Sequence, residues 1–160
     1  MNKRVMRFGL VLLALATLSL AGGVGSKARP FKAESRGYIT ADRWFTYDFF
    51  MSGHSTHLGR FECQFLGIQW LFPEDPGDPM NIADGTLIAA NGDSVNVHME
   101  DYYDHFDDSL GVVGHGTYVI TGGTGRFLNA SGTGSFIAII DVFSSDPPET
   151  SFTFDGTIVY

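Results

Sequence analysis

The sequence predicts an all-β fold: a closed antiparallel barrel of eight strands that follows a signal peptide. Seven or eight runs alternate apolar and polar residues with the period of a strand, and no segment after the N-terminus has the period of an amphipathic helix. Glycine-rich turns separate these runs. The chain also has 14 Phe, 6 Tyr and 2 Trp residues. Eight strands enclose a space that such side chains can just fill, or that can hold one small ligand.

The N-terminus has the features of an export signal. Lys3, Arg4 and Arg7 form a basic region, residues 8–20 are almost entirely apolar, and small residues lead to a cleavage site after Ala21. A membrane-spanning helix needs about 20 apolar residues, so this stretch is too short to serve as an anchor. We therefore expect a signal peptide at 1–21, a basic linker at 22–36 and a β-barrel domain at 37–160, with the mature protein secreted or periplasmic.

Composition limits the partners of the mature chain. The formal net charge is −8, and most of the basic residues precede residue 37, so the barrel domain is strongly acidic. An acidic body repels nucleic acid and anionic lipid, so we expect neither nucleic acid nor, after cleavage of the signal, a membrane as a partner. Cys63 is the only cysteine, which excludes an internal disulfide. Phe61 and Phe65 at spacing two predict a buried, unreactive thiol.

The expected strands follow one another with short connections. They cover residues 43–53, 58–70, 84–90, 94–102, 114–121, 132–142 and 151–160. The second run is long enough to bend at Gly67 and to form one strand or two. Both faces of 132–142 are apolar, which indicates that the outer surface packs against another subunit in a homodimer or homotrimer.

Turn residues predict how these strands connect. Asn91-Gly92 between two alternating runs is the strongest short-range signal of a hairpin. The glycines from Gly122 to Gly134 predict a second sharp connection, because glycine adopts a positive φ at no steric cost. Segments 72–80 and 100–109 are expected to be acidic loops. Tyr102, Tyr103 and Phe106 in the second loop are expected to cover one mouth of the barrel.

The C-terminal third carries a family resemblance. Segment 119–127 reads Val-Ile-Thr-Gly-Gly-Thr-Gly-Arg-Phe, followed by Gly-Thr-Gly at 132–134 and by Phe-Thr-Phe-Asp-Gly-Thr-Ile at 152–158. These motifs resemble the C-terminal half of the allene oxide cyclase and dirigent β-barrel families. Segments 56–61 and 89–93 are similar to parts of small exported bacterial proteins with this barrel, so the resemblance covers about 55–160.

The resemblance implies an eight-stranded barrel with a ligand cavity along its axis, often assembled into dimers or trimers. Allene oxide cyclases steer the cyclisation of an unstable fatty-acid epoxide, and dirigent proteins orient radicals or quinone methides during coupling. Both depend mainly on the shape of an apolar cavity that excludes water. The cyclases place a buried carboxylate after a tyrosine on the first strand, and Tyr47-Asp48 is the pair that matches. This chain continues with Phe49-Phe50 where that family has a polar residue.

Candidate site residues follow from alternation and from the resemblance. The expected ligand-binding side chains are apolar or aromatic and lie on strand faces: Tyr47, Phe49, Phe61, Cys63, Phe65, Tyr118, Phe136 and Phe154. Asp48 and Glu62 are the catalytic candidates. Arg60 and Arg126 are expected to pair with carboxylates such as Glu62 or Asp155.

Three function classes stay open. The first is an exported barrel that binds a small apolar ligand or serves as an assembly module, without assigned catalysis. The second is a cyclase, isomerase or dirigent-type coupling guide, and the third is a calcium-stabilised surface module. His98, Glu100 and His115 could form a metal site, but exposed polar residues on a strand are far more often only solvated. We therefore expect no metal and no other cofactor.

Overall fold

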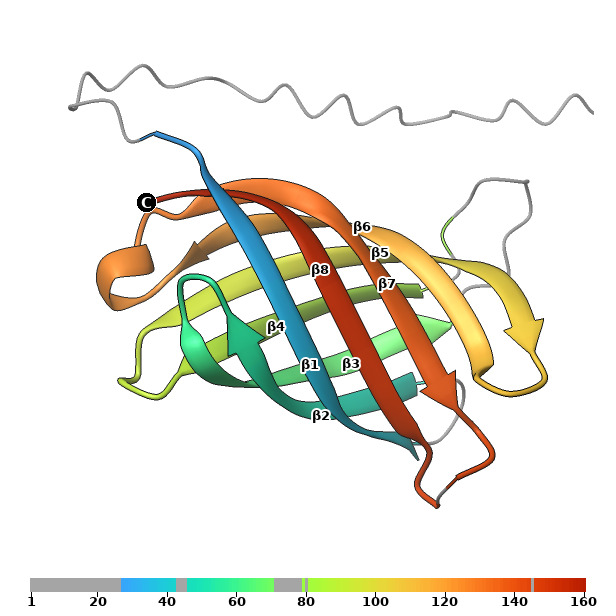
Figure 1. The fold of residues 1–160 in the computed structure, drawn as a ribbon. Coiled ribbons are helices and arrows are strands. Elements are labelled where there is room, and N and C mark those ends of the chain that lie inside the picture. The colour runs from blue at the N-terminus through green and yellow to red at the C-terminus, as the bar shows by residue number, and fades with distance from the viewer. Residues whose placement is uncertain (1–26, 43–45, 71–78, 80, 145) are drawn as a thin grey trace, which may run out of the picture.

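Eight antiparallel strands form one closed barrel, in which each strand pairs with its neighbours in the chain and the last pairs with the first (Figure 1). The structure is a computed structural model that describes residues 27–42, 46–70, 79, 81–144 and 146–160. The elements are β1 (Arg29–Asp42), β2 (Thr46–Ser55), β3 (Gly59–Trp70), β4 (Asn81–Ala89), β5 (Ser94–Asp107), β6 (Gly111–Gly123), the 3-10 turn η1 (Gly125–Phe127), β7 (Ser131–Asp141) and β8 (Glu149–Val159). The all-β class and the closed eight-stranded barrel are confirmed.

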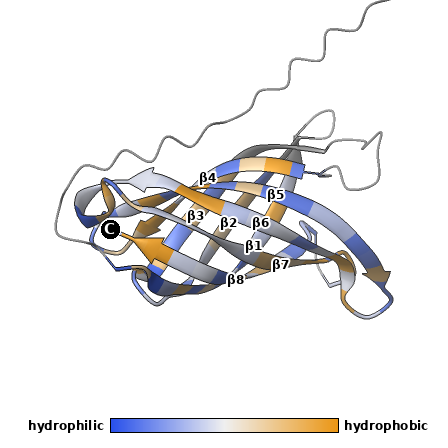
Figure 2. Ribbon diagram, turned by 90° about the horizontal axis from the view of Figure 1, so that it is seen from above, coloured by the Kyte–Doolittle hydropathy of each residue, from blue (hydrophilic) through white to orange (hydrophobic). Residues whose placement is uncertain are grey.

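Most expected strands lie where the alternation places them. Figure 2 shows apolar and polar stretches alternating along the strands. The Asn91-Gly92 hairpin joins β4 to β5, and Gly92 has a φ of +87°. The run 58–70 forms the single strand β3, with a register irregularity between Leu66 and Gln69. The expected loop at 72–80 lies almost entirely outside the described residues. None of the described helices is long and apolar enough to cross a membrane.

The first strand begins earlier than the sequence predicts. β1 starts at Arg29, inside the segment 22–36 that was expected to be a basic linker. It pairs with β2 on one side and with β8 on the other, so it is the strand that closes the barrel. Phe31 and Ala33 are buried and alternate with exposed Lys32 and Glu34. The charges of this segment therefore mark the outer face of a strand.

The prediction of an acidic loop at 100–109 is also wrong, because most of this segment is strand. β5 continues to Asp107 and pairs with β6 as far as Gly111. The Asp107 carboxylate closes the turn by accepting hydrogen bonds from the backbone N–H groups of Ser109 (2.8 Å) and Leu110 (3.0 Å). The Ser109 hydroxyl donates to the same oxygen at 2.6 Å, and together with the two backbone N–H groups it holds the pKa of Asp107 below its ordinary value. Apart from Asp101, the acidic residues that suggested a loop are residues of the outer strand face and of the turn.

Aromatic rings fill the middle of the barrel. Phe152 is the hub of this packing, with ring centroids 5.6 Å from Phe49 and Phe136 and 6.3 Å from Phe65. Inward-facing glycines make room for these rings. A Cβ added at Gly85 would lie 2.0 Å from the ring of Phe65. The interior is thus packed by aromatic rings that lie against the backbone of inward-facing glycines.

The two ends of the barrel differ. At one end, which we call the η1 end, lie η1, the turn between β2 and β3, and the C-terminus (Figure 1). Phe127 of η1 is fully buried and its ring contacts Tyr160 at 4.8 Å. The hairpin between β5 and β6 lies at the opposite end, which we call the hairpin end.

Candidate functional site

The structure brings most of the predicted ligand-binding side chains together inside the barrel. Each of the seven whose side chain is described is at most 5% exposed: Phe49, Phe61, Cys63, Phe65, Tyr118, Phe136 and Phe154. The side chain of Tyr47 lies outside the described part of the chain. Several of these rings contact one another, such as Tyr118 and Phe154 at 5.5 Å. They form an aromatic column in the middle of the barrel.

The single cysteine belongs to this column. Burial raises the pKa of Cys63 to about 12, and a hydrogen bond with Ser35 lowers it only in part. The thiol is therefore neutral at any physiological pH and acts as a small apolar group.

The two predicted catalytic carboxylates lie outside the barrel interior. Glu62 is exposed and stands between buried Phe61 and Cys63, so its side chain points to the outer face. Asp48 is partly exposed and precedes buried Phe49, which turns Asp48 to the outer face as well. Strand alternation therefore separates both carboxylates from the aromatic column.

A different carboxylate, Asp101, points into the barrel. It continues the inward-facing series of Val95, Val97 and Met99 on β5. Its Oδ2 accepts a hydrogen bond of 3.1 Å from the side-chain amide of Asn81, the residue opposite it on β4. Its Oδ1 is buried and has no hydrogen-bond partner among the described residues.

On the side away from Asn81, Asp101 lies against the backbone of a glycine. Its side chain lies against Gly114 on β6, where an added Cβ would be 2.8 Å from Oδ1. Beside Asp101 on the inner face of the barrel, Ala83 of β4 and Met99 of β5 are cross-strand partners and both are buried. We call these two residues the apolar wall. Asp101 and Asn81 thus form a polar pair beside an apolar wall, toward the hairpin end of the barrel.

Burial changes the protonation of this carboxyl. It raises the pKa of Asp101 from 3.8 to about 6, while the Asn81 hydrogen bond, the nearby His115 and the Tyr102 backbone amide each lower it in part. A carboxyl with a pKa near neutrality exchanges protons readily and can donate or accept a hydrogen bond. Asp101 is therefore a candidate for ligand binding or for proton transfer.

Tyr118 supplies a second polar atom inside the barrel. Its hydroxyl is buried without a hydrogen-bond partner among the described residues, and it lies against Gly134 and Gly156 of the facing strands. Burial, assisted by the charge of Asp155, raises its pKa to about 12. The tyrosine is therefore neutral, and its hydroxyl packs against backbone on the side of the aromatic column toward the η1 end.

The residues proposed as a metal site do not converge. His98 Nδ1 lies 2.8 Å from Asp84 Oδ1 on the outer face. His115 stacks on Tyr102 with ring centroids 5.9 Å apart. In the described part of the chain, no three His, Cys, Asp or Glu side chains are placed to hold a metal ion.

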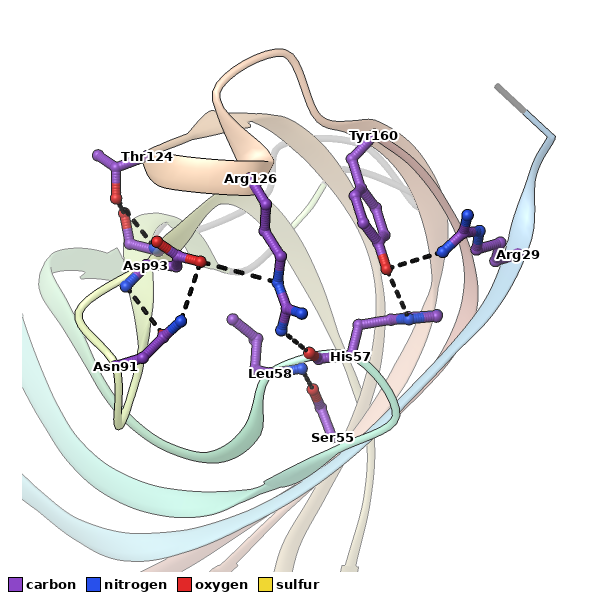
Figure 3. A network of polar contacts seen from close by, with 10 residues as sticks. Arg29, Ser55, His57, Leu58, Asn91, Asp93, Thr124, Arg126 and Tyr160 are labelled. Carbon is purple, nitrogen blue, oxygen red and sulfur yellow. Dashed lines mark hydrogen bonds and ion pairs between the residues drawn. The ribbon is translucent and has the colours of Figure 1, made fainter. Parts of the chain in front are cut away.

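Arg126 pairs with a carboxylate as predicted, but this carboxylate belongs to Asp93 and not to Glu62 or Asp155. At the η1 end its Nε lies 3.7 Å from Asp93 and its Nη2 donates to the backbone oxygen of His57 (Figure 3). Asp155 instead pairs with Lys32 at 3.4 Å. Arg126 therefore ties η1 to two neighbouring turns and serves the stability of this end.

Tyr160 ties the C-terminus into the same network. Its hydroxyl lies 3.2 Å from His57 Nδ1 and accepts a hydrogen bond of 3.1 Å from Arg29 (Figure 3). His57 Nε2 lies 2.8 Å from the Pro30 carbonyl oxygen. This carbonyl can only accept, so Nε2 carries the proton and Nδ1 accepts from Tyr160. The network ties the C-terminus to β1 and to the turn between β2 and β3.

Comparison of the chain with protein-family models, with curated proteins and with solved structures finds no match. The resemblance to allene oxide cyclases and dirigent proteins therefore stays a prediction from motifs. The geometry around Asp101 carries the functional argument.

Proposed function

We propose that this protein is an exported β-barrel that binds one small, largely apolar molecule through a hydrogen bond to Asp101. The unpartnered, buried Oδ1 of Asp101 carries the proposal. A buried oxygen without a partner costs about 1–3 kcal/mol, so a ligand with a hydrogen-bond donor gains that energy by filling the position.

The surroundings of Asp101 define the rest of the ligand. The buried wall beside it, Ala83 and Met99, offers apolar contact. The Asn81 amide holds Oδ2, which leaves Oδ1 as the carboxyl oxygen without a hydrogen-bond partner among the described residues. A small number of fixed polar groups in a mostly apolar lining is the usual design of a small-molecule site.

Two predictions from the sequence join this proposal. The basic and apolar segment at 1–21 supports secretion or export to the periplasm. The motifs that resemble allene oxide cyclases and dirigent proteins support an apolar ligand, since both families act on such molecules.

A matched pair of probes tests the proposal. 2-Naphthol has a hydroxyl donor, whereas 2-methoxynaphthalene has nearly the same shape without the donor. We expect the protein to bind 2-naphthol at least about tenfold more tightly, equivalent to about 1.4 kcal/mol. Asp101→Leu should abolish this preference, and Asp108→Leu, which removes an exposed carboxylate of the same hairpin, should keep it. No binding of either probe at millimolar concentration, or a preference that survives in Asp101→Leu, would refute the proposal.

Acid–base catalysis is the second candidate function, and the pKa of about 6 at Asp101 favours it. A general probe is the ring opening of 5-nitrobenzisoxazole. In this reaction a carboxylate removes the C3 proton, the N–O bond breaks, and a cyanophenolate leaves. A rate that rises with pH through about 6, and that Asp101→Asn loses, would assign catalysis. Tight 2-naphthol binding without this activity would assign binding alone.

A further inference from the structure

Two oxygen atoms border the space beside Gly114 on the inner face of the barrel. The point that a Cβ of residue 114 would occupy lies 2.8 Å from Asp101 Oδ1 and 3.1 Å from the backbone oxygen of Tyr102. A backbone oxygen has two lone pairs, so it can accept from a ligand in addition to its strand partner. A donor group on the inner side of Gly114 therefore meets two acceptors.

The surroundings offer no side-chain donor to this space. On β6, the inward positions beside Asp101 are Gly114 and Gly116, which have no side chain. On β4, the Asn81 amide donates to the other carboxyl oxygen, Oδ2. Oδ1 has no hydrogen-bond partner in the part of the chain that the structure describes. A ligand at this place has to bring the donors itself.

No described basic side chain forms an ion pair with Asp101. The described ion pairs join other carboxylates to Lys32, His98, His105 and Arg126. His115, the histidine whose charge acts on Asp101, is exposed and stacks on Tyr102. Because the pKa of Asp101 is about 6, this largely buried carboxyl is mostly ionised at neutral pH. Buried charges are normally paired, so the site favours a cationic ligand.

The hairpin end of the barrel attracts cations. Asp107 and Asp141 lie in two turns there, and these turns adjoin, since the rings of Phe106 and Phe143 contact each other at 5.7 Å. Each carboxylate accepts hydrogen bonds from a serine hydroxyl and from backbone N–H groups of its own turn, which hold its pKa below the ordinary value. Both are therefore ionised at neutral pH. An acidic surface raises the local concentration of cationic ligands and repels anions.

A primary ammonium group matches these features better than a hydroxyl does. A hydroxyl has one proton to donate, so it leaves one of the two acceptors unserved and the carboxylate charge unpaired. An ammonium group has three donors and a positive charge in a compact volume. Building on the proposed function, we propose that the ligand of the Asp101 site is a small apolar primary amine. Its ammonium group binds Asp101 Oδ1 and the Tyr102 backbone oxygen, and its apolar part packs on the apolar wall.

Four probes of similar shape test this inference by isothermal titration of the mature protein at about pH 7.5, where the amine is protonated and Asp101 is ionised. They are 2-naphthylmethylamine, 2-naphthylmethanol, 2-methylnaphthalene and (2-naphthylmethyl)trimethylammonium. We expect the primary amine to bind at least about tenfold more tightly than the alcohol. The trimethylammonium probe keeps the charge but has no N–H donor and a larger head. It should bind at least about tenfold more weakly than the primary amine.

Two variants assign the preference to Asp101. Asp101→Asn nearly keeps the shape of the side chain but removes its charge. It should lower the affinity for the amine at least about tenfold and the affinity for the alcohol less than about threefold. Asp108→Asn, which removes an exposed carboxylate of the same hairpin, should keep the amine affinity within about threefold. Variants are compared only where far-UV circular dichroism and the melting temperature show a folded protein.

The possible outcomes separate this inference from the proposed function. The inference is overturned if the alcohol or the trimethylammonium probe binds as tightly as the primary amine, or if the amine affinity survives in Asp101→Asn. A protein that prefers 2-naphthol to 2-methoxynaphthalene but does not prefer the amine to the alcohol would overturn this inference alone and leave the proposed function standing. If no naphthalene probe binds, both are overturned.

Discussion

Replacing Asp101 by asparagine should stabilise the protein near neutral pH, because the carboxyl is ionised there at an energetic cost. The pKa of Asp101 is raised from 3.8 to about 6, mainly by burial. A difference of one pH unit in pKa corresponds to about 1.4 kcal/mol, so the ionised form lowers the free energy of unfolding by up to about 3 kcal/mol. Asparagine keeps the shape and can still accept the Asn81 hydrogen bond, but it cannot ionise.

The direction of the pKa shift at Asp101 determines how the stability of the protein depends on pH. The folded state binds the Asp101 proton more tightly than the unfolded state does, so the wild-type protein loses stability as pH rises from about 4 to about 6. The Asp101→Asn variant should not lose stability over this pH range, because asparagine does not ionise. The two proteins should therefore be similar in stability at about pH 3.5, and the variant should be more stable by about 2–3 kcal/mol above about pH 6.5.

Urea denaturation followed by circular dichroism, at several values between about pH 3.5 and about pH 8, measures this difference. Asp108→Asn, which removes an exposed carboxylate of the same hairpin, is the control and should follow the wild-type curve. Parallel pH profiles for the wild type and Asp101→Asn would refute the reasoning, as would a variant that is less stable at neutral pH.

Three other substitutions test the packing and the η1 end, each by urea denaturation. Gly85→Ala puts a methyl group into the space of the Phe65 ring, 2.0 Å from its nearest atom, and should lower stability by about 1–3 kcal/mol. A loss below about 0.5 kcal/mol would contradict the close contact. Arg126→Gln breaks the ion pair with Asp93 and should lower stability by about 1 kcal/mol at low salt, with a smaller loss at high salt. Tyr160→Phe keeps the ring but removes the hydroxyl and should lower stability by about 1 kcal/mol; an unchanged midpoint would argue against the network.

Alternation in the sequence predicts most of the barrel because strands such as β3 have a run of large apolar residues at their inward positions. Phe61, Cys63 and Phe65 on β3 are an example, and all three are buried as predicted. β1 was missed because its inward series is weak. Ser35 and Gly37 follow Phe31 and Ala33 on that face, so small residues interrupt the apolar period, while the charged outer face resembles a linker.

The candidate site was missed for a related reason. Period two along β5 places Asp101 on the same face as Val97 and Met99, so the sequence does contain the signal. A charged residue at an inward position breaks the hydrophobic pattern, and the acidic residues after it suggested a loop. Residues that break a local pattern are expected at functional sites, because function places a polar group where folding alone favours an apolar one.

The packed interior limits where this barrel can act. The ring of Phe152 contacts Phe49, Phe65 and Phe136, and the rings of Phe65 and Phe136 fill the space beside Gly85 and Gly116. An interior packed in this way changes shape only at high energetic cost, so we expect the middle of the barrel to act as a rigid core. Binding then falls to surfaces that this core holds in place, such as the wall around Asp101.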